Sequence, residues 1–334
     1  MTEKKYPLTT AIAGTTHRTV SCTAALLDDA RFSLEWILTP TPKPIGRKQV
    51  LTPNPLDSFA NEHHLPVIHI SEKVDQATQT AVKEAAPIDF LLVVDFGYFV
   101  PKWLLDTPAT APLNIHPSEL PKWRGSSPAQ FSILFGDTDS AVTLMRMNSS
   151  FDQGPLIAQI PFSVPDSWTS EDYYKHSFSL ITAELPDLIE TYYRNRDETP
   201  QPKESPTVIA QRITKEDAFI PWNIVNQTIK NSGYMLTDTD LAQLSPLLRM
   251  AAKKHHTAAS LVDAACRAFW PWPKLWTVVS TQKGEKRMQI HEVEYRNEND
   301  SDAATKFELR TVQLEGQSAA AFNQVKNILS PTYL

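Results

Sequence analysis

An amide, an imidazole and a carboxylate occur in this chain in a pattern that suits acyl transfer. Asn114 and His116 are two residues apart in the apolar run that starts at Ala111, and Asp152 lies in a later Ser-Phe-Asp-Gln-Gly turn. In a strand, residues i and i+2 point to the same face. Asn114 and His116 can therefore project together into one pocket.

Each of the three groups has a chemical task that fits such a reaction. An amide N–H can stabilise a developing oxyanion. An imidazole can take or return a proton near neutral pH, and a carboxylate can hold its tautomer and favour its charged form. No Ser or Cys nucleophile is needed if a substrate amine attacks. The alternative is a structural histidine and an aspartate that serves only its turn, and composition alone does not separate these interpretations.

The elements around these residues predict an α/β fold, a Rossmann-like doubly wound and mainly parallel sheet. Residues 8–13 read as a strand, 20–27 as a helix and 34–39 as a second strand, which is the order that opens such a sheet. Residues 90–94 (FLLVV) are apolar on both faces, as buried parallel strands require. The sheet would present Asn114 and His116 at the end of the strand over residues 111–116.

The residues from 114 to 154 resemble the signature of the folate-dependent formyltransferases, and among these the enzymes that act on methionyl-tRNA. The matching string is Asn-x-His-x-Ser-x-Leu-Pro-x-Trp-Arg-Gly, followed by Asp-x-Gly. The resemblance implies that Asn114, His116 and Asp152 are the catalytic trio. It also implies that a loop holds the tetrahydrofolate, namely Ser118, Glu119, Leu120 and Pro121. The chain departs from the family at Pro117, usually Gly, and at Glu119, often apolar and here expected to face outward.

Two further segments receive roles from the same resemblance. After the strand at residues 90–94, Gly97, Val100 and Pro101 match a turn whose backbone cradles the pterin ring, whereas Asp95 and Phe96 depart from the family. Asp95 could contact pterin amines or cap the next helix. The Pro-rich, basic stretch over residues 40–48 is expected to be a mobile loop, and its Arg47 and Lys48 are expected to bind tRNA.

The turn after the first strand also departs from the family. Gly14-Thr15 matches its opening, but Thr16-His17-Arg18 stands where the family commonly has Pro and an acidic residue. His17 and Arg18 could lie near the mouth of the site. We favour the simpler interpretation that both are solvated residues at the start of a helix.

Length and composition set the broad class. The chain has 334 residues, enough for two domains, and a net charge of −6, which argues against a generally basic nucleic-acid binder. Cys22 and Cys266 suggest no disulfide framework. No apolar run approaches a membrane span, and the start of the chain does not resemble a secretory signal. We expect a cytoplasmic monomer without a metal; the pair His63-His64 lacks further ligands at metal-binding spacing.

The domain boundary is expected in the polar, Pro-rich stretch 196–207, read as a linker. Residues 1–205 would form the catalytic domain and residues 206–334 a C-terminal OB-like β-barrel that binds tRNA, with a helical insertion near 224–260 of unassigned role. A second string, Arg267-Ala-Phe followed by two Trp-Pro pairs, resembles the family motif that precedes the barrel.

The resemblance implies transfer of a formyl group from 10-formyltetrahydrofolate to the α-amine of methionine on initiator methionyl-tRNA. One alternative keeps the chemistry and changes the acceptor to an amino-sugar nucleotide or another small amine. A second alternative is a non-catalytic folate- or RNA-binding relative. The complete trio argues against the second alternative, because a binding module would not need all three groups.

Overall fold

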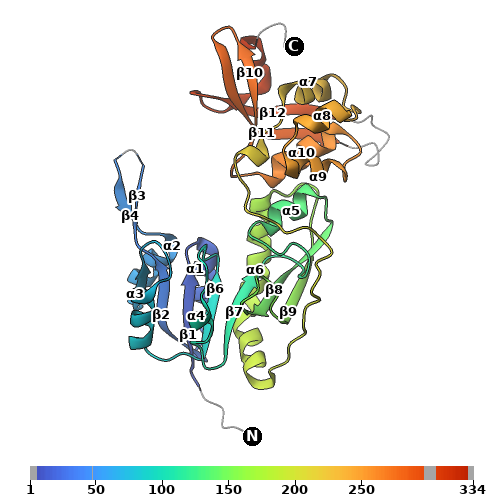
Figure 1. Cartoon of the computed structure of the whole chain (residues 1–334). Helices are drawn as coiled ribbons and strands as arrows, with labels where there is room; N and C mark the ends of the chain where they lie inside the picture. The colour runs from blue at the N-terminus through green and yellow to red at the C-terminus, as the bar shows by residue number, and fades with distance from the viewer. Residues whose placement is uncertain (1–5, 47, 297–305, 330–334) are drawn as a thin grey trace. The chain divides into compact units, whose positions relative to one another are not determined.

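The computed structural model describes residues 6–46, 48–296 and 306–329. The chain divides into two compact units (Figure 1). Unit 1 consists of residues 1–125, 140–162 and 175–209. Unit 2 consists of residues 126–139, 163–174 and 210–334. Two short segments that precede residue 175 thus belong to unit 2, whereas the sequence suggests a single division after residue 205.

Unit 1 is built on a seven-stranded sheet with the order β5-β2-β1-β6-β7-β8-β9. Its strands are β1 (Leu8–Gly14), β2 (Phe32–Pro40), β5 (Val67–Ile70), β6 (Phe90–Val94), β7 (Ala111–His116), β8 (Asp139–Arg146) and β9 (Leu156–Ser163). The pairs from β5 to β7 are parallel and β7 pairs antiparallel with β8. The helices are α1 (His17–Leu27), α2 (Pro55–Glu62), α3 (Gln76–Glu84), α4 (Lys102–Leu105) and most of α6 (Ser170–Asn195). The predicted mainly parallel, Rossmann-like sheet is confirmed.

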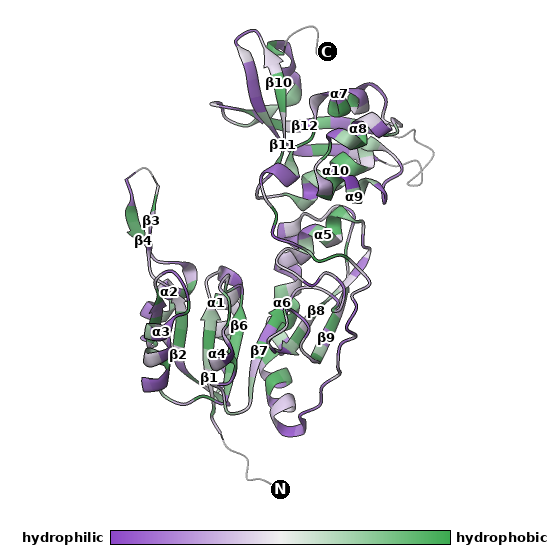
Figure 2. Ribbon diagram, viewed as in Figure 1, coloured by the Kyte–Doolittle hydropathy of each residue, from purple (hydrophilic) through white to green (hydrophobic). Residues whose placement is uncertain are grey.

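The core of the sheet lies in its central strands. All five residues of β6 are buried, and Figure 2 colours β1 and β6 as mostly hydrophobic. Strand order reverses between β1 and β6, since the chain first builds outward through β2 and β5 and then returns to the other side of β1. In open α/β sheets the crevice at such a reversal, outside the carboxyl ends of the strands, is where ligands bind.

The carboxyl ends of β1 and β6 approach each other closely at Gly14. A Cβ on Gly14 would lie 2.3 Å from the carbonyl oxygen of Val94 and 2.4 Å from Cγ2 of Thr19. A side chain cannot fit there, so glycine permits the turn after β1 to lie directly against the end of β6.

The basic stretch after β2 is a β-hairpin, which corrects the expected loop without packed structure. β3 (Lys43–Ile45) pairs antiparallel with β4 (Val50–Thr52), and all six residues are exposed. The hairpin projects from the rest of unit 1 (Figure 1). Proline is tolerated in a two-stranded ribbon because both strands are edges.

The stretch 196–207 is not a free linker, which corrects a second expectation. Thr199 pairs with Leu156 of β9 through two backbone hydrogen bonds of 2.8 Å. Ser205 Oγ donates to the carbonyl of Pro121 at 2.7 Å, and Thr207 Oγ1 accepts from the backbone N–H of Trp123 at 2.8 Å. We call residues 199–207 the strap, because they are hydrogen-bonded to β9 and to the loop after β7. The preceding helix α6 runs from Ser170 to Asn195 with Pro186 inside it.

Unit 2 contains helices and an antiparallel sheet. The helices are α5 (Pro128–Leu134), α7 (Trp222–Lys230), α8 (Asp238–Gln243), α9 (Pro246–Ala252), α10 (Ala258–Ala268) and α11 (Phe322–Val325). The sheet has the order β10 (Leu275–Thr281), β11 (Gly284–Arg296), β12 (Lys306–Leu314) and β13 (Ala320–Ala321). This sheet is consistent with the predicted OB-like barrel, although it does not close within the described residues. The stretch near 224–260 is helical, as expected.

Candidate active site

Strand β7 brings Asn114 and His116 to one face, as the sequence predicts. Asn114 pairs with Val93 of β6 on one side and with Met145 of β8 on the other. The His116 side chain is 6% exposed, and the Asp152 side chain is 12% exposed. The distance from His116 Nδ1 to Asp152 Oδ2 is 3.8 Å. All three predicted catalytic groups come from unit 1, and the imidazole and carboxylate are neighbours.

The backbone fixes the tautomer of His116. Its Nε2 lies 3.0 Å from the carbonyl oxygen of Trp123. A carbonyl only accepts, so Nε2 carries the hydrogen and the neutral ring has its lone pair on Nδ1. From the sequence, Asp152 was the group expected to hold the tautomer. In the structure, Asp152 Oδ2 faces Nδ1 at a distance longer than a hydrogen bond. His116 Nδ1 is therefore the nitrogen that can take up a proton, beside a carboxylate that would stabilise the resulting charge.

Asp152 is held by the backbone around it. Its Oδ2 accepts from the N–H of Gly125 at 2.8 Å, and its own φ is +50°. Two residues later, a Cβ on Gly154 would lie 1.8 Å from the carbonyl oxygen of Arg146. The Asp-x-Gly motif thus has a steric cause, because only glycine lets the chain after Asp152 pass so close to β8.

Three residues other than glycine have a positive φ at or beside the site: Asp95 at +48°, Trp123 at +56° and Asp152 at +50°. For Trp, which is bulky, this region is a genuine outlier. Such strain persists only where the surroundings impose it, and it clusters at functional sites. At Trp123 it aims the carbonyl at His116 Nε2.

Asn114 offers an unused acceptor. Its Nδ2 donates to the carbonyl of Val93 at 3.0 Å, which sets the orientation of the amide. Its Oδ1 is buried and has no hydrogen-bonding partner in the described part of the chain. A buried polar atom without a partner costs free energy, so the site is suited to a reactant that donates a hydrogen here. Nδ2 retains a second hydrogen that can reach an oxyanion.

Arg124 and Gln201 form a brace behind Asp152 that the sequence analysis missed. Gln201 Nε2 donates to the carbonyl oxygens of Asp152 (3.0 Å) and Gly154 (2.7 Å). Gln201 Oε1 accepts from Arg124 Nη2 at 2.9 Å, and Arg124 is 2% exposed. Burial lowers the pKa of Arg124, while the nearby Asp152 opposes this shift. Arg124 could have been found from the sequence, because it is part of the matching string. Gln201 could not, because it stands in a stretch that reads as a linker.

The loop after β7 is tied mainly to the protein itself. Ser118 is fully buried, and its Oγ donates to the carbonyl of Lys122 at 2.7 Å. Leu120 is 2% exposed, and the carbonyl oxygens of Leu120 and Pro121 accept from Gln159 and Ser205. Glu119 is exposed and pairs with Lys122 at 2.9 Å. The outward position expected for Glu119 is confirmed, whereas Ser118 lies inside and stabilises the loop.

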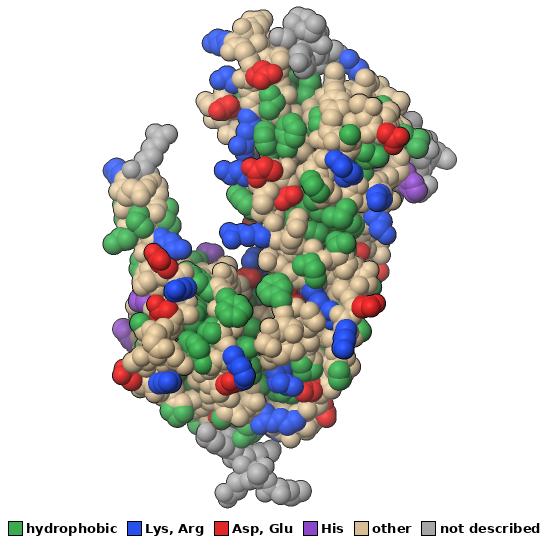
Figure 3. Space-filling model, viewed as in Figure 1, with side chains coloured by type: hydrophobic (Ala, Val, Ile, Leu, Met, Phe, Trp, Pro, Cys, Tyr) green, Lys and Arg blue, Asp and Glu red, His purple; other side chains and the backbone are tan. Residues whose placement is uncertain are grey.

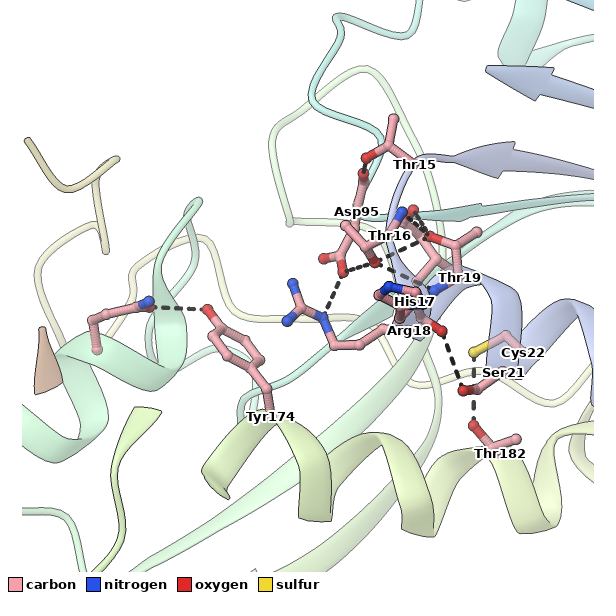
Figure 4. Close-up of polar contacts among 12 residues, drawn as sticks. Thr15, Thr16, His17, Arg18, Thr19, Ser21, Cys22, Asp95, Tyr174 and Thr182 are labelled. Atoms are coloured by element: carbon pink, nitrogen blue, oxygen red, sulfur yellow. Dashed lines mark hydrogen bonds and ion pairs between the residues drawn. The ribbon is translucent and has the colours of Figure 1, made fainter. Parts of the chain in front are cut away.

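The turn after β6 contains the second group of predicted residues. Gly97 has a φ of +72° and is exposed, and Tyr98 and Val100 pack partly buried against the core of unit 1. Asp95 does not cap the next helix, α4, which begins after Pro101 without a side-chain cap. Its carboxylate accepts from Thr16 and pairs with Arg18 of α1 at 2.6 Å (Figure 4). The interpretation of Arg18 as a solvated residue at the start of a helix is therefore wrong, because its side chain forms an ion pair with Asp95.

One of the two residues predicted to bind tRNA, Lys48, stands in the turn of the β3–β4 hairpin. Lys48 is exposed there, and Arg47 lies outside the described residues. Both residues are remote in sequence from the trio, and the hairpin gives Lys48 an exposed position.

A cavity of about 630 Å³ lies elsewhere, in unit 2, among α10, β11 and neighbouring segments. It contains none of the predicted site residues. Its Asp263 and Arg267 pair with each other at 2.9 Å. Burial raises the pKa of Asp263, and Arg267 opposes the shift. No group of three His, Cys, Asp or Glu side chains within the described ranges could hold a metal ion.

Comparison with known proteins supports the same chemistry. A model of the family described as Formyl transferase matches residues 10–186. A methionyl-tRNA formyltransferase of Legionella pneumophila strain Paris is 29% identical over 287 residues, covering 85% of this chain and 78% of that protein. The methionyl-tRNA formyltransferase of Stutzerimonas stutzeri is 31% identical over 256 residues, covering 71% and 80%.

Solved structures agree at the level of the fold. An N-formyltransferase from Helicobacter canadensis, solved with folinic acid and dTDP-3-aminofucose, has a TM-score of 0.57 and 16% identity, covering 92% of this chain and 95% of that one. The family match spans more than half of the sequence and contains Asn114, His116 and Asp152. The chain therefore belongs to the formyl transferase family and is a formyl-transferring enzyme.

Proposed function

We propose that this enzyme transfers a formyl group from 10-formyltetrahydrofolate to the α-amino group of methionine on initiator methionyl-tRNA, for translation initiation. The observation that carries the proposal is the cluster of Asn114, His116 and Asp152 at the carboxyl end of β7. The named relatives, at 29% and 31% identity over most of the chain, favour methionyl-tRNA as the acceptor.

In this proposal the protein positions the reactants and stabilises charge. The bound folate supplies an activated formyl group. Asn114 Nδ2 donates to the formyl oxygen as negative charge develops there, and Asn114 Oδ1 accepts an N–H from the attacking amine. His116 Nδ1 takes the proton that the amine loses, and Asp152 stabilises the imidazolium. His116 then returns this proton to the leaving nitrogen of the folate, N10, as the bond from N10 to the formyl carbon breaks. Because the nucleophile belongs to the substrate, orientation carries much of the catalysis.

We assign the donor to the two loops beside the trio. The turn with Gly97, Val100 and Pro101 and the loop Ser118–Pro121 flank Asn114 and His116 in the chain. The buried, unpartnered Oδ1 of Asn114 fits a site that is completed by reactants. In the loop Ser118–Pro121, the buried Ser118 would act by holding the backbone, because its hydroxyl is committed to Lys122.

We assign the tRNA to the hairpin and to unit 2, each from its own charge. Arg47 and Lys48 would reach the acceptor end from the β3–β4 hairpin. In Figure 3, Lys and Arg side chains gather over β10 and β11 of unit 2, where Lys283 is exposed and Lys286 and Arg287 are partly exposed. Phosphate contacts of this kind make binding strongly salt-dependent.

The decisive assay offers the enzyme 10-formyltetrahydrofolate with either methionyl-tRNA or an amino-sugar nucleotide. We expect formylation of methionyl-tRNA alone. Replacing Asn114→Ala or Asp152→Ala should lower kcat by about a hundred-fold or more, since a lost charge-stabilising contact typically has that effect. Asp106→Ala, which removes an exposed carboxylate paired with Lys102, is the matched control and should leave kcat unchanged.

Two results would contradict the proposal in different ways. Near-normal turnover in both site variants would remove the trio from catalysis. Formylation of the amino-sugar nucleotide in place of methionyl-tRNA would keep the chemistry and establish the alternative acceptor.

A further inference from the structure

The turn after β1 and the turn after β6 are joined by side-chain hydrogen bonds at the reversal of strand order. Three of these bonds converge on Asp95: Thr15 Oγ1 donates to its carbonyl oxygen (2.9 Å), and Thr16 Oγ1 (2.8 Å) and Arg18 Nε (2.6 Å) both bond to its Oδ2 (Figure 4). Thr19 Oγ1 adds a bond to the carbonyl of Val94 at 2.8 Å. The turn after β1 and the first turn of α1 therefore hold Asp95, the first residue of the loop Asp95–Pro101, in place.

The hydrogen bonds to Asp95 hold a strained segment of backbone. Asp95 has a φ of +48° and Gly97 a φ of +72°. A residue other than glycine keeps such a conformation only where neighbouring groups impose it. The bonds to Asp95 supply that constraint, and its carboxylate is also favoured by the positive end of the α1 dipole.

Arg18 is itself held in place. Its guanidinium lies 5.5 Å from the centre of the Phe178 ring in the part of α6 that belongs to unit 1. The side chains of Arg18 and Asp95 are 34% and 22% exposed, so the pair is partly withdrawn from solvent. In the sequence, Arg18 and Asp95 are two separate departures from the family. In the structure they form an ion pair.

We propose that Arg18 and Asp95 form a clamp that holds the loop Asp95–Pro101 in the conformation that binds the folate formyl donor, with Arg18 as a positioning residue. The inference rests on the proposed function, in which this loop contacts the donor. When a binding loop is competent for only part of the time, apparent affinity falls by that fraction. Once donor is saturating, the groups on Asn114 and His116 are unchanged, so kcat should be retained.

The test measures donor binding apart from turnover. Calorimetry with 5-formyltetrahydrofolate gives Kd, and assays with 10-formyltetrahydrofolate give KM for the donor and kcat. For Arg18→Ala we expect Kd and the donor KM to rise about five-fold or more, as for a loop competent a fifth of the time, with kcat within a factor of two. Arg18→Lys, which keeps the charge without the guanidinium geometry, should recover part of the affinity.

A second variant separates the ion pair from the backbone strain. Asp95→Asn keeps a residue type that tolerates a positive φ but removes the charge that Arg18 meets. Its Kd should rise as in Arg18→Ala. The Kd of the double variant should not exceed the higher Kd of the two single variants, because each single substitution already breaks the same contact.

Arg31→Ala is the matched control. The Arg31 side chain is 32% exposed and pairs with Asp29 (2.6 Å), Asp187 (2.7 Å) and Glu190 (2.5 Å), so the substitution removes ion pairs elsewhere in unit 1. Its Kd should equal that of the wild type. Wild-type affinity in both Arg18→Ala and Asp95→Asn, or a loss confined to kcat, would overturn the clamp. An enzyme that does not formylate methionyl-tRNA but still loses 5-formyltetrahydrofolate affinity in Arg18→Ala would refute the acceptor and keep the clamp.

Discussion

At the scale of single residues, the sequence predicts site residues that lie in a local pattern. It does not predict residues whose role depends on segments distant in the sequence. Asn114 and His116 follow from a period of two in a strand, and Asp152 from the matching string. The carbonyl of Trp123 and the amide of Gln201 could not be found this way, because their roles depend on a positive φ and on a residue 49 positions away from Asp152. Sequence reasoning therefore supplied the three groups that we propose to react, and missed the groups that orient them.

The brace leads to a prediction about Gln201. Gln201→Leu removes both donors to the carbonyls of Asp152 and Gly154 and the acceptor for Arg124. Small misplacement of a catalytic group is costly, so kcat should fall about ten- to a hundred-fold, with little change in the donor KM. Steady-state kinetics beside the exposed Gln243→Leu as control would check this. An unchanged kcat would show that Asp152 keeps its position without the brace.

At the scale of elements, the regular strands and helices could be predicted and the Pro-rich stretches could not. β1, β2, β6 and β7 appear close to their expected bounds because buried parallel strands are apolar throughout. Residues 40–48 and 196–207 were read as loop and linker from their prolines. Proline is tolerated at the edge of a sheet; here one stretch forms a hairpin, and the other hydrogen-bonds to β9 and to the loop after β7. Composition does not tell a free extended segment from one that finds a partner.

Glu198, the residue before the strap, gives a prediction about pH. Glu198 accepts from Arg146 of β8 at 2.8 and 2.7 Å, and this hydrogen bonding is the main cause that lowers the pKa of Glu198 below its ordinary 4.5. A lowered folded pKa means that the pair stabilises the protein above pH 4.5 and loses that effect as pH falls through the folded pKa. Both side chains are about a third exposed, so Glu198→Gln should lower the free energy of unfolding at pH 7 by about 0.5–1 kcal/mol.

Urea unfolding at a series of pH values measures this difference. The gap between wild type and Glu198→Gln should narrow below pH 4.5, while the exposed Glu62→Gln variant should track the wild type throughout. A gap that stays constant as pH falls would assign the effect of Glu198→Gln to something other than its charge.

At the scale of the whole molecule, charge is distributed unevenly, and this was visible in the sequence. Residues 206–334 carry 15 Lys and Arg against 13 Asp and Glu, whereas the first 205 carry 17 against 25. The more basic half is the one with the antiparallel sheet. The composition of the two compact units was not visible, because residues 126–139 and 163–174 join the second unit through contacts that no local pattern reveals. No helix within the described ranges is long and apolar enough to cross a membrane.

One cysteine in each unit allows the two units to be followed separately. Cys22 is in unit 1 and Cys266 in unit 2; both are buried, and burial raises the pKa of each thiol to about 12. Because the thiolate is the reactive form, neither should react appreciably with a chromogenic thiol reagent at pH 8 in the native protein, and both should react in urea. Mass spectrometry of the labelled sites assigns each one. Rapid labelling of either cysteine in the folded enzyme would contradict its burial.

The strap also affects how the enzyme can be divided. A truncation that ends before residue 199 would keep every member of the trio yet discard Gln201, Ser205 and Thr207, and with them the contacts to Asp152, Pro121 and Trp123. An isolated N-terminal fragment meant to retain its chemistry should therefore extend through Ile209, where the first compact unit ends. The covalent connection between the halves is at the same time a structural component of the catalytic half.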